Sequence, residues 1–151
     1  MTLTVECTTA ADTRSLGRRL AAMLRPGDVI LLGGGLGAGK TVFASGVGEG
    51  LGVEEPVVSP TFVLVRFYDG LMPLVHADVY RVGSSAEVED LDLPFEARDG
   101  VLLVEWGEAV EQCFPEDHLV VRLEAGEDET RKVTLDGRGT WASRPLREAA
   151  G

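Results

Sequence analysis

The chain has 151 residues, of which 44% are hydrophobic and 26% charged, a composition typical of one globular domain. It carries 25 acidic and 14 basic residues, a formal net charge of −11, which excludes nucleic-acid binding through simple attraction to a basic surface. A membrane-spanning helix needs about 18 apolar residues, and no apolar run approaches this length. The first residues do not resemble an export signal, so we expect a cytoplasmic protein that does not associate with a membrane.

The N-terminal part predicts a strand, a helix and a second strand. Residues 2–7 alternate weakly between polar and apolar side chains, which favours a strand. Thr9 is a suitable helix N-cap, and apolar residues recur on one face through residues 16–24. Pro26-Gly27 ends that helix, and the apolar run 29–32 then predicts a buried strand.

Residues 34–41, Gly-Gly-Leu-Gly-Ala-Gly-Lys-Thr, fit the phosphate-binding pattern G-x-x-x-x-G-K-[ST] at every fixed position. The glycines let backbone N–H groups surround a phosphate, and the start of the next helix adds partial positive charge. Lys40 is expected to reach the β- and γ-phosphates, and the Thr41 hydroxyl to bind Mg²⁺. The loop residues predicted to bind ATP are Gly35, Leu36, Gly37, Ala38, Gly39, Lys40 and Thr41.

Two other interpretations of the loop are weaker. A glycine-rich turn followed by Lys-Thr by chance does not account for the strand before it and the helix after it. A dinucleotide-binding G-x-G-x-x-A also fits residues 33–38, but it requires an acid at the end of a second strand roughly 20 residues on. Glu54 and Glu55 stand at that distance, yet no apolar run precedes them.

The predicted helix after the loop contains Gly46, Gly48 and Gly50, each of which costs about 1 kcal/mol of helix stability relative to alanine. We expect them to allow close packing against the sheet. Two apolar runs at 62–68 and 71–75 then meet at Asp69-Gly70, a strong hairpin signal.

The second half predicts a short helix from a capping box at Ser84 and a buried strand at 101–104. A further helix is expected before Pro115, and residues 118–123 with 131–135 form a second hairpin. The fold class is therefore α/β: a P-loop NTPase-like mixed sheet flanked by helices, with antiparallel hairpins. We expect one ATPase domain over residues 1–137 and a flexible tail over 138–151.

A P-loop needs an acid at the end of a neighbouring strand to help Thr41 hold Mg²⁺. Glu105 ends the most continuously apolar strand after the loop strand, and is the preferred metal ligand. Asp78 follows Leu74-Val75-His76-Ala77 and is expected to position the attacking water or to support the metal.

Three further motifs follow the loop: Ser-Pro-Thr-Phe-Val-Leu-Val at 59–65, His-Ala-Asp-Val-Tyr-Arg at 76–81 and Val-Glu-Trp-Gly-Glu at 104–108. Together with the loop they resemble the bacterial TsaE (YjeE) family over about residues 11–125. That family is the small ATPase subunit of the machinery that makes threonylcarbamoyladenosine in tRNA. The family often has Asp where this chain has Gly35, a position that is variable in the general P-loop pattern.

The resemblance implies roles for individual residues. Lys40, Asp78 and Glu105 would serve ATP hydrolysis, with Thr41 and Glu105 as Mg²⁺ ligands. The segment containing Ser59 and Thr61 would sense the γ-phosphate, Trp106 would lie beside the nucleotide, and Arg131 near its base. Trp106, Tyr80 and His76 also admit a plain packing role, and Arg81 that of a surface charge. The partners implied are TsaB and TsaD, with tRNA contacted only through that complex.

The stretch 84–117 carries eleven acids against one base, Arg98. This pattern fits a solvated face or a docking surface for a basic partner. With one arginine and no evident arginine finger in this stretch, we expect low intrinsic hydrolysis that depends on partners. A small-molecule kinase usually closes an arginine-bearing lid, which this stretch does not suggest, whereas an ATP-gated binding module without significant turnover stays open. A GTPase is disfavoured because the sequence has no asparagine for N-K-x-D.

Overall fold

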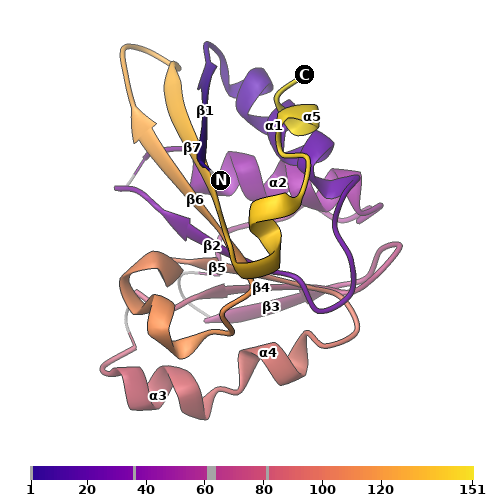
Figure 1. Ribbon diagram of the computed structural model, residues 1–151, viewed down its shortest axis with the longest axis vertical. Helices are drawn as coiled ribbons and strands as arrows, with labels where there is room; N and C mark the ends of the chain where they lie inside the picture. The colour runs from indigo at the N-terminus through magenta and orange to yellow at the C-terminus, as the bar shows by residue number, and fades with distance from the viewer. Residues whose placement is uncertain (1, 36, 61–63, 81) are drawn as a thin grey trace.

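The computed structural model describes residues 2–35, 37–60, 64–80 and 82–151, and within them seven strands form one mixed sheet with helices on both faces (Figure 1). The strands are β1 (Thr2–Cys7), β2 (Val29–Gly33), β3 (Val65–Tyr68), β4 (Leu74–Asp78), β5 (Val101–Glu105), β6 (His118–Ala125) and β7 (Arg131–Arg138). The α-helices are α1 (Ala10–Ala21), α2 (Lys40–Gly50), α3 (Ser85–Asp90), α4 (Leu93–Glu96) and α5 (Arg147–Ala150). Two 3₁₀ segments, η1 (Gly107–Cys113) and η2 (Gly139–Ser143), complete the fold.

The sheet has the order β1-β7-β6-β2-β5-β4-β3. Its four middle strands, β6, β2, β5 and β4, are parallel, whereas β7, β1 and β3 join through antiparallel pairs. The α/β mixed sheet expected from the sequence is confirmed. Because parallel strands end at the same edge, β2, β4 and β5 deliver Gly33, Asp78 and Glu105 to one place.

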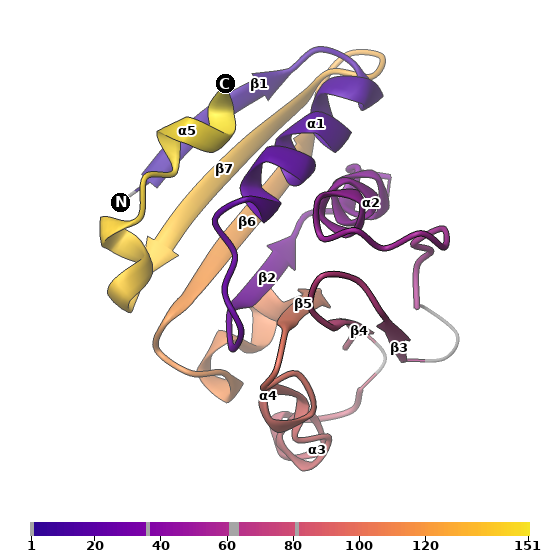
Figure 2. The same cartoon turned by 90° about the vertical axis from the view of Figure 1, so that its right-hand side faces the viewer.

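The apolar composition of the central strands explains their position. Every residue of β2, β4 and β5 is buried, as expected for parallel strands covered on both faces. One core cluster joins the sheet to α1, α2 and the C-terminal residues, and the other joins it to α3, α4 and η1. Figure 2 shows α1 and α2 together beside the strands, and α3 and α4 together below them. Within the described part of the chain, no helix combines the length and apolarity needed to cross a bilayer.

The glycines of α2 serve a different contact from the one expected. A Cβ added at Gly46 would overlap the backbone carbonyl of Arg14, and one at Gly50 would overlap Ala21, so both face α1. Only Gly48 faces away from α1, toward Val57. The expectation that these glycines pack against the sheet is wrong for Gly46 and Gly50, because the approach that needs them is between the two helices.

Several elements match the sequence expectation, with shifted ends. Thr9 and Asp12 form a capping box at α1, and the Ser84 hydroxyl accepts from the Glu87 N–H at α3. Both hairpins form, but the first has its strands separated by residues 69–73 rather than by a two-residue turn. The helix expected before Pro115 is the 3₁₀ segment η1.

The C-terminal residues, expected to be a flexible tail, are instead folded onto the domain. Trp141 is 1% exposed, and Leu146 and Ala149 are fully buried in the core cluster of α1 and α2. Arg144 forms two short hydrogen bonds to the Asp28 carboxylate, with donor–acceptor distances of 2.6 and 2.7 Å, and its guanidinium lies over the Trp141 ring. A small number of buried apolar side chains holds this segment on the domain. Its mostly polar composition therefore led to the wrong expectation of a flexible tail.

We predict that Trp141→Ala lowers the free energy of unfolding by about 3–5 kcal/mol, because it leaves a large cavity beneath η2. The exposed Arg147→Ala in the same segment is the control and should change it by less than about 0.5 kcal/mol. Urea unfolding followed by circular dichroism measures both. Equal, small effects would mean that the segment is loose in solution.

Candidate functional site

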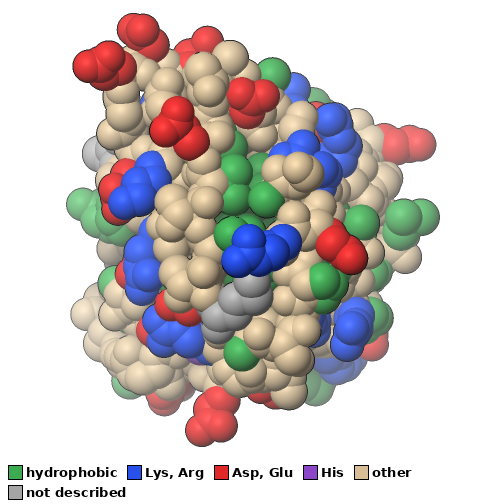
Figure 3. Space-filling model, turned by 45° about the horizontal axis from the view of Figure 1, so that its top comes forward, with side chains coloured by type: hydrophobic (Ala, Val, Ile, Leu, Met, Phe, Trp, Pro, Cys, Tyr) green, Lys and Arg blue, Asp and Glu red, His purple; other side chains and the backbone are tan. Residues whose placement is uncertain are grey.

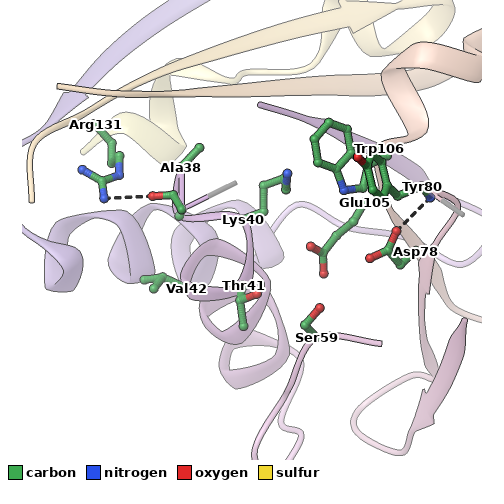
Figure 4. Close-up of a pocket in the computed structure, with 12 residues that line it drawn as sticks. Ala38, Lys40, Thr41, Val42, Ser59, Asp78, Tyr80, Glu105, Trp106 and Arg131 are labelled. Atoms are coloured by element: carbon green, nitrogen blue, oxygen red, sulfur yellow. Dashed lines mark hydrogen bonds between the residues drawn. The ribbon is translucent and has the colours of Figure 1, made fainter. Parts of the chain in front are cut away.

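A cavity of about 460 Å³ lies between the glycine loop and the ends of β4 and β5 (Figure 4). Its lining contains most of the site residues expected from the sequence, although these come from five separate segments of the chain. The lining residues are Gly37, Ala38, Gly39, Lys40, Thr41, Val42, Ser59, Asp78, Tyr80, Glu105, Trp106 and Arg131. Gly35 is not among them, and Leu36, Thr61 and Arg81 fall outside the described residues.

The loop reaches its shape through glycines with a left-handed backbone. The φ angles of Gly34, Gly37 and Gly39 are 132°, 75° and 101°, values that side chains with a Cβ rarely adopt. Gly39 is the N-cap of α2, so the first N–H groups of that helix lie at the cavity. These groups have no partner within the helix and carry partial positive charge, which suits an anion.

Lys40 is buried although it is charged. Its Nζ donates to the carbonyl oxygens of Gly34 (2.6 Å) and Gly35 (3.3 Å) and lies 3.7 Å from the centre of the Trp106 ring. Burial lowers the pKa of Lys40, whereas the negative charge of Glu105 works in the opposite direction. The ammonium group is thus held at the loop by dipoles and a π face, contacts that an anion in the cavity can replace.

Two carboxylates face Lys40 and Thr41 across the cavity. Asp78 and Glu105 are register partners at the ends of β4 and β5, and both are at least nine-tenths buried. Asp78 accepts a hydrogen bond from the backbone N–H of Tyr80 at 2.9 Å. Figure 4 shows both carboxylates pointing into the cavity, toward the side where Thr41 and Ser59 lie.

An aromatic wall closes one side of the cavity. The rings of Tyr80 and Trp106 have centroids 4.6 Å apart and are tilted by 34°. The backbone of Trp106 has a φ angle of 65°, which is strained for a bulky residue. This conformation turns the chain from the end of β5 into η1. Sequence reasoning left Tyr80 as a packing residue and did not name Val42, which directly follows Thr41; both line the cavity.

Arg131 closes the opposite end of the cavity. It begins β7, and its Nη2 donates to the Gly37 carbonyl at 3.1 Å (Figure 4). A contact between residues 94 positions apart fixes the second hairpin beside the loop.

The oxygen atoms in the cavity fit a hard divalent cation. The described residues include no group of three or more His, Cys, Asp or Glu side chains placed to hold a metal. Thr41, Asp78 and Glu105 nevertheless offer one hydroxyl and two carboxylates, and both carboxylates point into the cavity. Mg²⁺ in nucleotide sites takes one or two protein oxygens and completes its shell with phosphate and water, so this donor set is sufficient.

A parallel strand, a glycine loop and a helix, with acids ending the adjacent strands, define the class: an α/β protein of the P-loop type. Residues 7–133 match the profile of a family described as "Threonylcarbamoyl adenosine biosynthesis protein TsaE". The chain belongs to the TsaE family.

Similar proteins of known sequence or structure support this family assignment. The TsaE protein of Streptomyces coelicolor is 48% identical over 147 residues, covering 91% of this chain and 99% of that protein. The TsaE protein of Bacillus subtilis is 41% identical over 129 residues, covering 85% and 81%. The crystal structure of Bacillus subtilis YdiB superimposes with a TM-score of 0.81 and 34% identity, covering 99% of this chain and 94% of that one.

We predict that Glu105→Gln lowers the pKa of Lys40 further, because it removes a negative charge that stabilises the ammonium form. The sequence has only one other lysine, Lys132, so ¹³C-labelled lysine gives a simple NMR titration in which Lys40→Arg assigns the signals. Asp69→Asn, in an exposed turn, is the control and should leave the Lys40 midpoint in place. A Lys40 midpoint that rises in Glu105→Gln would contradict this electrostatic description of the cavity.

Proposed function

We propose that this chain binds Mg-ATP in the cavity and hydrolyses it slowly, as an accessory subunit in the threonylcarbamoyl modification of tRNA adenosine. One observation carries the proposal: a single cavity joins the helix N-terminus, Lys40, Thr41 and two strand-end carboxylates. Each of these groups has a separate task in phosphoryl chemistry. Membership of the TsaE family supports the connection to tRNA.

The triphosphate would lie along the glycine loop. Lys40 would exchange its contacts with the loop carbonyls for phosphate oxygens, and the N-terminus of α2 would add donors. Thr41 and Glu105 would hold Mg²⁺, which neutralises charge on the β- and γ-phosphates when bound. Arg131 and Val42, at the far end of the cavity, would flank the base.

Water and the γ-phosphate would meet at the acidic end. Asp78 lies beside Glu105 in the register and would orient the attacking water. Ser59, the one described member of the predicted sensing pair, lines the same end of the cavity and would contact the γ-phosphate. Tyr80 and Trp106 would exclude bulk water from this end.

The surface supports a protein partner more than direct RNA binding. Basic side chains on the face in Figure 3 are scattered among acidic and polar ones rather than gathered in one patch. The net charge of −11 agrees with this distribution, because RNA binding depends on phosphate neutralisation. We propose TsaB and TsaD as the partners, with tRNA reached through them.

The acidic stretch 84–117 is only partly available for docking. Glu105 is buried, Glu108 pairs with Arg122, and Glu111 pairs with His118 and Arg138. The exposed acids lie mainly on and around α3 and α4: Glu87, Glu89, Asp90, Asp92, Glu96, Asp99, Glu116 and Asp117. The proposed docking surface for a basic partner is reduced to these residues.

We predict that Lys40→Ala lowers the affinity for Mg-ATP at least tenfold, because the ammonium group that would contact the phosphate oxygens is lost. Isothermal titration calorimetry measures the change. The control is Lys132→Ala, which removes the same charge from an exposed position on β7 and should bind as the unaltered protein does. Unchanged affinity in Lys40→Ala would place the nucleotide elsewhere.

We further predict that sustained threonylcarbamoyl modification, reconstituted from purified TsaB, TsaD and tRNA, needs this chain and fails with Lys40→Ala. Transfer of phosphate to a small acceptor in place of water would favour a kinase. Modification supported by bound ATP without turnover would favour an ATP-gated binding module. Modification that proceeds normally with Lys40→Ala would contradict the ATPase role.

A further inference from the structure

His76 is a fully buried histidine directly behind the proposed metal ligand. It lies in the middle of β4 and is 0% exposed. Its Nε2 lies 2.7 Å from Glu105 Oε2, within hydrogen-bonding distance although the ring is not aligned for a hydrogen bond. Neither ring nitrogen has a hydrogen-bond partner, and the same is true of Glu105 Oε2.

The strand register places His76 on the cavity side of the sheet. Side chains two residues apart on a strand share a face, so His76 and Asp78 point the same way. Asp78 is the register partner of Glu105, and Leu103, the partner of His76, belongs to the core cluster of α1 and α2. His76 therefore lies one step behind the two acids, beneath the cavity rather than in its lining.

An unpaired imidazole at this depth is costly. A buried polar group without a hydrogen bond loses its contacts with water and gains none in return, a loss that an apolar residue would avoid. A small rotation of the ring would align Nε2–H with Glu105 Oε2, giving partners to two of the unpaired atoms at once. The other Glu105 oxygen would then be directed toward Thr41.

We infer that His76 is a positioning residue, which donates Nε2–H to Glu105 Oε2 and fixes the carboxylate in the orientation that binds the divalent cation. This inference rests on the proposed Mg-ATP function and assigns to His76 no contact with nucleotide or water. Arg66, the register partner of His76 on the neighbouring strand β3, also has a buried Nε without a hydrogen-bond partner. Residues behind metal ligands typically change metal affinity by about 10- to 100-fold when they are removed.

The test compares two amides at position 76. The glutamine amide nitrogen reaches about as far from the backbone as Nε2 of histidine, whereas that of asparagine stops near the position of Nδ1. Calorimetric ATP titrations at a series of free Mg²⁺ concentrations measure the Mg²⁺ needed for half-maximal affinity. We expect His76→Asn to raise this concentration about 10- to 100-fold and His76→Gln to restore it largely, while ATP binding without Mg²⁺ is the same in both.

Two results would overturn the inference. One is an equal Mg²⁺ requirement in the Asn and Gln variants, whether normal or raised, because reach would then be irrelevant. The other is a His76→Asn effect that persists in full in a Glu105→Gln background, since a residue that acts through Glu105 has nothing left to orient there.

A measurement on the unaltered protein covers variants that do not fold. Nitrogen-15 NMR of the histidine rings should show a proton on His76 Nε2, and a neutral ring with its proton on Nδ1 would overturn the inference. The proposed function fails separately, if the unaltered chain binds no ATP or binds it independently of Mg²⁺. In that case the NMR result still decides whether His76 donates to Glu105.

Discussion

The register between parallel strands β2, β5 and β4 is the constraint on which the site depends. β5 lies between the other two, with Leu32 opposite Glu105 on one side and Asp78 opposite Glu105 on the other. A shift of one residue in β5 would turn Glu105 to the opposite face of the sheet and bring an apolar side chain to the cavity. Every residue of these three strands is buried, which makes such a shift very unfavourable. Packing of the core therefore also fixes the positions of the two carboxylates.

The sequence predicted those features of the fold that depend on interactions between residues close together in the chain. The loop, its flanking strand and helix, the Thr9 cap and both hairpins followed from spacing, turn residues and periodicity. Asp78 and Glu105 could be selected as strand-end acids, and the parallel sheet then placed them side by side. The positions of Trp106 and Arg131 near the loop came from the family resemblance, because no local rule places residue 131 beside residue 37.

What the sequence did not reveal depends on contacts between distant parts of the chain. The C-terminal segment has few apolar residues, and its stability comes from Trp141 and the pairing of Arg144 with Asp28, more than one hundred residues earlier. The glycines of α2 indicate a close approach but not its partner, which the tertiary fold decides to be α1. The acidic stretch looked like one continuous surface, yet two of its members, Glu108 and Glu111, pair with basic groups on β6 and β7.

The ammonium group of Lys40 is a hydrogen-bond donor to its own loop. Its ammonium group already has two carbonyl acceptors and an aromatic face, so a ligand that recruits it gains only the difference between old and new contacts. The same contacts connect the glycine segment to Trp106, so groups of the protein itself hold the two walls of the cavity together. Under the proposed function, phosphate oxygens would compete with these protein groups for the lysine, which would favour reversible exchange of the nucleotide over very tight retention.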